Sequence, residues 1–219
     1  MREKVITRIH RGKLIAIVRG MEEGRILPLA EALYKGGITM IEVTFNQKDP
    51  ESFPTTARAI RGIRTRFGED VYAGAGTVLS TVELHMAADA GALYIISPNA
   101  DEEIIRETRR LGLVSLPGVL TAGECVMAHK AGADFLKLFP IGSVGAAYLK
   151  ALKAPLGHLH FLGVGGVDTA NIGEFLAAGA AGFGVGGKLV NKEWIDAGAF
   201  DRISALAAEY VQAVGGKEP

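Results

Sequence analysis

The segment "TVELHMAADAGALYIISPNADEEIIRETRRLG", residues 81–112, carries the pattern that decides the fold. Its two flanks, "TVELHMAADAG" and "DEEIIRETRRLG", place apolar residues three and four apart, which predicts amphipathic helices. Thr81 and Asp101 are suitable caps for these helices, and Gly91 and Gly112 are suitable stops. The apolar run "LYIIS" between them predicts a short buried strand. The segment therefore reads as helix, strand, helix.

The same unit recurs along the chain. Eight apolar runs predict strands at residues 14–19, 40–45, 71–77, 93–97, 114–118, 135–140, 160–166 and 182–187. Strands that alternate with helices indicate a parallel sheet covered on both faces. Eight such units in 219 residues predict an α/β fold, a single (β/α)8 TIM barrel domain over residues 1–219, with a short N-terminal helix at about residues 1–12. An open doubly wound sheet is the alternative, although it usually needs fewer units.

The charge balance argues against two classes of partner. The chain has 24 basic and 24 acidic residues without a run of five like charges, so it lacks the basic patch that nucleic acid or an anionic membrane requires. Its one cysteine, Cys125, allows no internal disulfide, and "MREKVITRIHRGK" lacks the apolar core of a signal peptide. We expect a cytoplasmic protein whose partner is a small molecule, with no nucleic acid and no membrane.

A lysine interrupts the predicted strand in "DFLKLFP", residues 134–140. Side chains alternate along a strand, so Phe135, Lys137 and Phe139 share one face. If that face points into the barrel, desolvation lowers the pKa of Lys137 and leaves part of it as a free amine, which can attack a ketone to form a Schiff base. The alternative is a structural lysine whose ammonium reaches solvent.

Glu42 raises the same question, because "IEVTF" places it between Ile41 and Val43 in a strand that otherwise looks buried. A structural ion pair with a barrel cation is one interpretation. Two isolated charges in one barrel favour a functional site instead. Beside a Schiff base, this carboxylate would move protons.

Two glycine-rich segments, "GVGGV" (residues 163–167) and "GVGGK" (residues 184–188), follow the seventh and eighth strands, where many barrels bind phosphate. Backbone N–H groups can approach an anion closely there, and a lysine adds charge. Glycines also serve tight turns, so each motif alone is weak. The candidate phosphate-binding residues are Gly165, Gly166, Gly186, Gly187 and Lys188.

The five histidines fall on predicted helices or loops, or at the start of a strand, the wrong end for barrel chemistry. We therefore expect no metal and no other cofactor.

Eight segments together resemble one known family. They are "LIAIVRG", "GGITMIEVTFN", "GAGTVLS", "ISPN", "LPGVLTAGE", "FLKLFP", "GVGGV" and "GVGGK". In this order and spacing the chain resembles the class I 2-keto-3-deoxy-6-phosphogluconate / 4-hydroxy-2-oxoglutarate aldolases over nearly its whole length. The resemblance implies a homotrimeric aldolase that releases pyruvate from a 2-keto-3-deoxy-6-phospho sugar acid or from 4-hydroxy-2-oxoglutarate. The aldehyde product would be glyceraldehyde 3-phosphate or glyoxylate.

The resemblance also implies roles for single residues. Lys137 would be the Schiff-base lysine and Glu42 the acid and base. Thr77 would hold the pyruvate carboxylate, while Pro98 and Phe139 would wall the pocket.

Two of the departures from the phosphogluconate-type pattern concern the substrate carboxylate. Asn46 stands where those members carry an arginine, and Arg19 ends the first strand, as in the phosphogalactonate-type branch. Asn46 is a candidate substrate-binding residue, but it supplies no charge, so we expect the fork of Arg19 to pair the substrate carboxylate. The alternative is an ion pair between Arg19 and Glu42.

Two other functions remain open at this point. One is an isomerase or epimerase of sugar phosphates, and the other is a non-catalytic ligand-binding barrel. A lysine paired with a glutamate fits an aldolase better than either.

Overall fold

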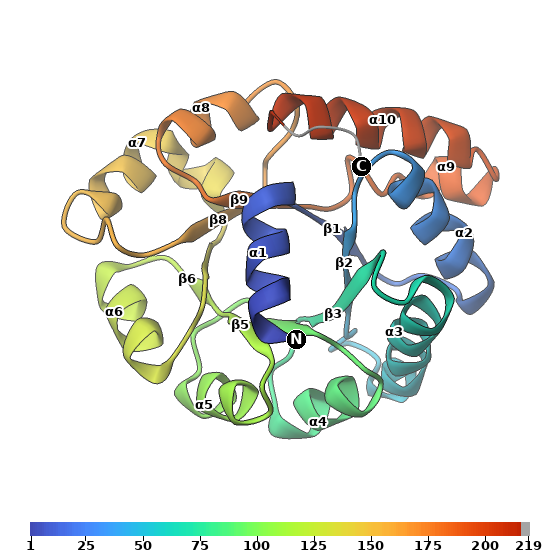
Figure 1. The fold of residues 1–219 in the computed structure, drawn as a ribbon, viewed down its shortest axis with the longest axis horizontal. Helices are drawn as coiled ribbons and strands as arrows, with labels where there is room; N and C mark the ends of the chain where they lie inside the picture. The colour runs from blue at the N-terminus through green and yellow to red at the C-terminus, as the bar shows by residue number, and fades with distance from the viewer. Residues whose placement is uncertain (216–219) are drawn as a thin grey trace.

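The computed structural model of the chain describes residues 1–215. Its parallel strands form one sheet in the order β5-β4-β3-β2-β1-β9-β8-β7-β6. The strands are β1 (Leu14–Val18), β2 (Met40–Thr44), β3 (Tyr72–Gly76), β4 (Tyr94–Ile96), β5 (Val114–Leu116), β6 (Gly118–Val119), β7 (Leu136–Leu138), β8 (Phe161–Val164) and β9 (Gly182–Val185). The two strands at the ends of this order, β5 and β6, are neighbours in the sequence, so the sheet curls into a barrel (Figure 1).

The eight predicted strands are confirmed, and the fifth is divided in two at Pro117. Proline has no N–H to donate, so the ladder is interrupted there. Its carbonyl still accepts a hydrogen bond from the Lys137 N–H, at 2.8 Å. β5 pairs with β4 and β6 pairs with β7, so the two pieces occupy one position in the ring. The open doubly wound alternative is therefore wrong.

The helices are α1 (Arg2–Gly12), α2 (Glu23–Lys35), η1 (Pro50–Ser52), α3 (Phe53–Phe67), α4 (Thr81–Asp89), α5 (Glu102–Arg110), α6 (Ala122–Ala131), α7 (Ile141–Lys153), α8 (Ile172–Ala177), α9 (Lys192–Asp196) and α10 (Phe200–Ala213). The helices after α1 surround the barrel in Figure 1. Asp101 caps α5 as predicted, accepting hydrogen bonds from the Glu103 and Ile104 N–H groups. The cap of α4 is Ser80 rather than Thr81.

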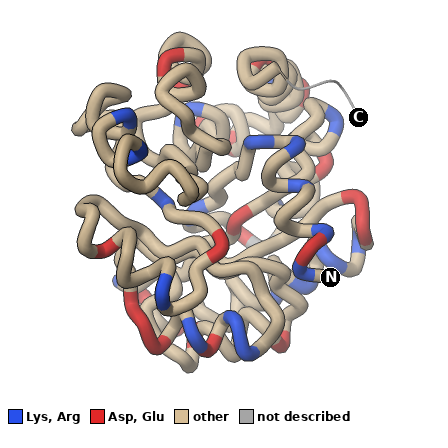
Figure 2. The backbone as a smooth tube through the Cα atoms, turned by 60° about the vertical axis from the view of Figure 1, so that its left-hand side comes forward, with Lys and Arg blue, Asp and Glu red and all other residues tan. Residues whose placement is uncertain are grey.

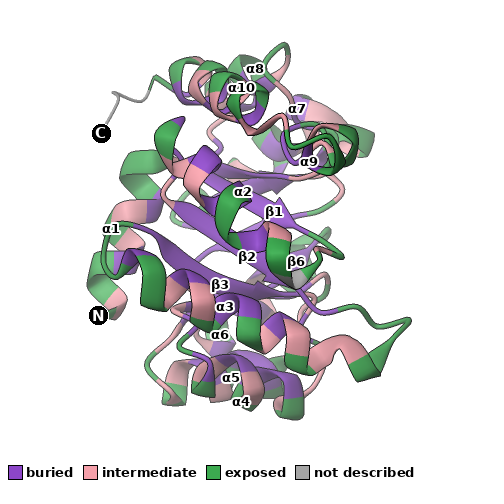
Figure 3. Ribbon diagram, turned by 90° about the vertical axis from the view of Figure 1, so that its right-hand side faces the viewer, coloured by how far each residue is buried: buried purple, intermediate pink, exposed green. Residues whose placement is uncertain are grey.

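The apolar core has two layers. The larger layer lies between the sheet and the surrounding helices, so the strands are buried while the helices expose their outer faces (Figure 3). The smaller layer fills the barrel itself. Its buried members are Val5, Ile9, Ile15, Met40, Tyr72, Tyr94, Ile96, Val114, Leu116, Phe135 and Leu162.

Helix α1 closes one end of the barrel. It crosses the ring of strands in Figure 1, and its Val5 and Ile9 side chains are each only 1% exposed in the inner cluster. Since α1 leads directly into β1, it covers the amino ends of the strands. Any chemistry inside the barrel must therefore be reached from the carboxyl ends, where barrel enzymes keep their sites.

Acidic and basic residues are interspersed along the chain in Figure 2.

Within residues 1–215, none of the helices combines the length and the apolar character that crossing a bilayer requires.

Candidate active site

Lys137 points into the barrel. Phe135 belongs to the inner cluster, whereas Leu136 and Leu138 belong to the outer one, so the alternation along β7 turns Lys137 inward. Its side chain is one of the few buried polar groups, at 7% exposed. The Lys137 side chain thus points into the barrel interior, on the same face of β7 as Phe135 of the inner cluster.

Glu42 points inward from β2 by the same argument, because Met40 is in the inner cluster while Ile41 and Val43 pack outward. It is paired in register with Ile17 of β1 and is 2% exposed. An almost fully buried carboxylate and a buried ammonium therefore face the interior of one barrel.

Glycines of β3 make room for this arrangement. A Cβ on Gly76 would lie 1.7 Å from Glu42 Oε1, and a Cβ on Gly74 would lie 2.3 Å from the Tyr94 ring. Any side chain at either position would displace its neighbour. The apolar pattern did not single out these two residues, although glycine at alternate positions of a strand is a signal of close approach by another group.

The burial of Glu42 and Lys137 shifts both groups toward their neutral forms. Desolvation raises the pKa of Glu42, against the attraction of Lys137 and Arg19, which lower it. Desolvation also lowers the pKa of Lys137, with Glu42 raising it and Arg19 lowering it further. Within the described residues, Glu42 Oε2 has no hydrogen-bond partner. The pair therefore offers a lysine with amine character beside a carboxyl group that has an unused oxygen.

A cavity of about 470 Å³ opens at the carboxyl ends of β1, β8 and β9. Its lining includes Arg19, Phe139 and the two glycine-rich segments. The Phe139 ring links it to the lysine, because Lys137 Nζ lies 5.0 Å from the ring centroid and a Cβ on Gly165 would lie 3.1 Å from the same ring. The cavity is therefore next to Lys137, with the Phe139 ring between them.

All five candidate phosphate-binding residues line this cavity. Gly165 and Gly166 adopt φ values of 85° and 78°, which favour glycine. The Lys188 ammonium forms an ion pair with Asp168, whose pKa is lowered mainly by that hydrogen bond. This end of the cavity therefore combines backbone of unusual conformation with a paired cation.

Thr77 and Pro98 lie close to the pair, and Asn46 lies apart from it. Thr77 directly follows Gly76, and a Cβ on Gly118, which pairs with Lys137, would lie 2.1 Å from the Pro98 carbonyl oxygen. Asn46 accepts a hydrogen bond from the Lys48 N–H at 3.2 Å and lines a separate cavity of about 260 Å³.

Comparison with known proteins gives a consistent result. A family model described as "Aldolase: KDPG and KHG aldolase" matches residues 5–206. The chain is 35% identical over 201 residues to the 2-dehydro-3-deoxy-6-phosphogalactonate aldolase of Escherichia coli K12, covering 91% of this chain and 93% of that protein. It resembles a native KDPGal structure with a TM-score of 0.83 and 33% identity, over 92% of this chain and 94% of the other.

A further solved structure is informative about chemistry. It is KDPG aldolase from Legionella pneumophila with pyruvate captured at low pH as a covalent carbinolamine intermediate. This chain resembles it with a TM-score of 0.83 and 28% identity, over 93% of this chain and 96% of the other.

Proposed function

As a member of the KDPG and KHG aldolase family, the chain is an aldolase, a carbon–carbon lyase, and we propose that it cleaves a 2-keto-3-deoxy-6-phospho sugar acid into pyruvate and glyceraldehyde 3-phosphate. The observation that carries the proposal is the inward, buried Lys137 with its lowered pKa beside Glu42. A free amine at that depth is suited to condense with a ketone.

The proposed reaction begins when the Lys137 amine attacks the C2 carbonyl, and loss of water gives an iminium ion. Glu42 then removes the proton of the C4 hydroxyl. The C3–C4 bond breaks, its electron pair moves into the iminium to give an enamine, and the aldehyde leaves. Protonation at C3 and hydrolysis of the imine release pyruvate and restore Lys137.

Glu42 has two features suited to this role. Its Oε2 atom lacks a partner among residues 1–215, so it can accept a substrate proton without first giving up a protein hydrogen bond. Its raised pKa also makes the protonated carboxyl accessible nearer to neutral pH than for an ordinary glutamate.

For the two anionic ends of the substrate we propose different partners. Thr77 and Arg19 would bind the carboxylate next to the iminium, with Pro98 and Phe139 as the walls. The N–H groups of the two glycine-rich segments, together with Lys188, would bind the 6-phosphate at the far end of the cavity. In this scheme Asn46 contacts the substrate only if its loop moves.

The configuration at C4 that we expect is the phosphogalactonate one. Arg19 ends the first strand as in that branch, and relatives at 34% and 35% identity carry the phosphogalactonate name. We further propose that the protein works as a cytoplasmic homotrimer, which light scattering on the purified chain would test.

The activity test is pyruvate release from a panel of keto acids. The panel contains the phosphogalactonate and phosphogluconate compounds, their dephosphorylated forms and 4-hydroxy-2-oxoglutarate. We expect the highest kcat/KM for the phosphogalactonate compound, and a loss for its dephosphorylated form that appears mainly in KM. Absence of pyruvate release from every member would overturn the proposal.

A further inference from the structure

Thr77 has an unusual backbone conformation. Its φ is 56°, and among residues 1–215 the other non-glycine residue with positive φ is Lys13, at the end of helix α1. A β-branched residue rarely adopts this region, because its side chain crowds the backbone there. Such a conformation persists when the surrounding structure fixes it, and it is found most often at functional sites.

Gln47 is one group that fixes it. This residue lies on the segment after β2, and its side-chain amide donates to the Thr77 carbonyl at 2.9 Å and to Glu83 Oε1 at 3.0 Å. Both partners are pure acceptors, so the NH₂ group of Gln47 must face them, and both of its donors are used. The amide therefore ties Thr77 to Glu83.

Glu83 is a rigid anchor for that tie. It is 4% exposed, and its other carboxylate oxygen accepts hydrogen bonds from the Leu79 and Ser80 N–H groups, the latter at 3.1 Å, at the start of α4. The next carbonyl, that of Val78, accepts from the Ser97 hydroxyl at 2.7 Å.

The turn after β3 is thus held through its backbone, while the Thr77 hydroxyl itself makes no hydrogen bond to any residue that the structure describes. It remains available for a ligand.

We propose that Gln47 is a positioning residue that aims the Thr77 hydroxyl at the substrate carboxylate. The inference rests on the proposed function, which puts that carboxylate at Thr77. Gly76, the preceding residue, abuts the Glu42 carboxylate, so a small rotation of Thr77 would move its hydroxyl relative to the reacting atoms. Gln47 does not touch those atoms, so it acts on binding of the keto acid and leaves bond cleavage to Lys137 and Glu42.

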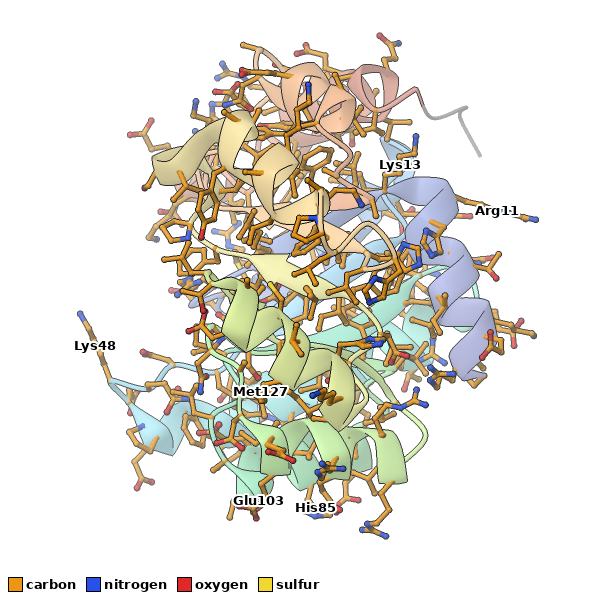
Figure 4. The ribbon with its side chains drawn as sticks, turned by 90° about the vertical axis from the view of Figure 1, so that its left-hand side faces the viewer. Arg11, Lys13, Lys48, His85, Glu103 and Met127 are labelled. Atoms are coloured by element: carbon orange, nitrogen blue, oxygen red, sulfur yellow. The ribbon has the colours of Figure 1, made fainter. Side chains whose placement is uncertain are left out.

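The first test compares Gln47→Met with Lys48→Met. Methionine is close to glutamine in length but donates no hydrogen bond. Lys48 is the next residue, is exposed, and extends away from the body of the protein in Figure 4, so its variant is a matched control. For Gln47→Met we expect pyruvate to bind about five- to tenfold more weakly, the scale of one or two lost hydrogen bonds. Turnover at saturation should change by less than about threefold, because only binding is affected.

The second test asks whether Gln47 works through Thr77. Thr77→Ala removes the hydroxyl, so Gln47→Met should then add less than about a twofold further loss of pyruvate affinity, whereas independent effects would multiply. If the Gln47 side chain only stabilised its own loop, Gln47→Met would lower the Tm, and its effect on pyruvate affinity would be independent of Thr77→Ala.

Three results would overturn the inference, and they separate it from the proposed function. In the first, Thr77→Ala weakens pyruvate binding but Gln47→Met binds pyruvate as well as Lys48→Met does. In the second, Gln47→Met weakens pyruvate binding as much in the Thr77→Ala background as it does alone. Either result would show that Gln47 does not position Thr77. If Thr77→Ala binds pyruvate like the unchanged chain, the proposed role of Thr77 fails and the inference fails with it. Pyruvate affinity is read from the concentration dependence of borohydride trapping.

Discussion

Two buried carboxylates at opposite ends of the barrel differ in how their charge is matched. Asp134, next to the amino end of β7, has a side chain 5% exposed and forms ion pairs with Arg2 and Arg109, the latter at 3.0 Å. It also accepts a hydrogen bond from the Ser115 N–H at 3.0 Å. Glu42, at the other end, is 2% exposed, yet its Oε2 has no partner within residues 1–215.

The difference shows how one barrel divides its tasks. Burial raises the pKa of both carboxyl groups. At Asp134 the hydrogen bonds from the Ser115 N–H and from Arg2 oppose this rise. The ion pair between Asp134 and Arg2 also joins α1 to the strands. At Glu42 the opposing charges are Lys137 and Arg19, which belong to the proposed catalytic site. A buried charge with all its bonds made stabilises the fold, whereas one with an unused oxygen is ready for substrate.

Of the substitutions at the carboxyl ends of the strands, where Glu42 lies, Lys137→Met should have the largest effect. Methionine keeps the apolar stem and removes the amine, so the fold should persist while aldol turnover falls by more than about 10⁴-fold, the scale of losing a covalent nucleophile. Steady-state pyruvate release measures the loss, and the exposed Lys130→Met is the control. If Lys137→Met kept its turnover, Lys137 would not be the nucleophile, and the buried charges at this end of the barrel would have no catalytic role.

Glu42→Gln comes next. The amide fills the same space beside Gly76 but cannot take a proton, so turnover should fall by about 10² to 10⁴, as for one positioned acid–base group. Imine formation should be slower yet reach the same final yield. Turnover close to that of the unchanged chain would make Glu42 structural, like Asp134.

Asp134→Ala should show the opposite profile. Two arginines lose a buried partner, so the free energy of unfolding should fall by about 3 kcal/mol, while kcat well below the Tm stays nearly unchanged. Glu3→Ala is the matched control, because Glu3 pairs with the same Arg2 but is 83% exposed, and such pairs contribute little. Denaturant unfolding measures both. Loss of kcat without loss of stability in Asp134→Ala would contradict the division between the two ends.

The pH dependence of imine formation sharpens the account of Lys137. The nucleophile is the neutral amine, so the trapping rate with pyruvate is lost as pH falls through the pKa of this lysine. Because burial lowers that pKa from 10.5, the midpoint should lie at a lower pH than for an ordinary lysine. A midpoint at or above 10.5 would mean that the ammonium is not desolvated.

Arg19→Lys gives the smallest expected change. Lysine keeps the charge but loses the two-pronged fork, so pyruvate affinity should weaken by about 1–3 kcal/mol, in line with one charged hydrogen bond. Asn46→Ala, measured by the same titration, should leave the affinity unchanged, since Asn46 lines another cavity. The reverse pattern would show that the carboxylate is not held from the first strand.

The sequence predicted what depends on periodicity. The alternation of apolar runs and helical segments fixed the order of the strands, and the period of two along "DFLKLFP" placed Lys137 opposite Leu136 and Leu138. The glycine-rich segments were found because their spacing places both of them after neighbouring strands. Each of these features is local in the chain.

Contacts across the fold could not be predicted in this way. The need for Gly76 arises from Glu42 on the next strand, and the conformation of Thr77 depends on Gln47 and Glu83 in other segments. In the sequence, Asp134 is only a polar residue before the strand that contains Lys137. Its structural role becomes visible when the fold brings Arg2 and Arg109 beside it. Pairings of this kind depend on tertiary structure and leave no periodic trace in one sequence.

Borohydride trapping tests the central claim most directly. The protein is mixed with pyruvate, reduced, digested and analysed by mass spectrometry. We predict inactivation together with one pyruvate-derived mass on the peptide that contains Lys137, and neither effect when pyruvate is omitted. A label on Lys130 or Lys150 alone, with Lys137 unmodified, would contradict the assignment of Lys137 as the Schiff-base lysine.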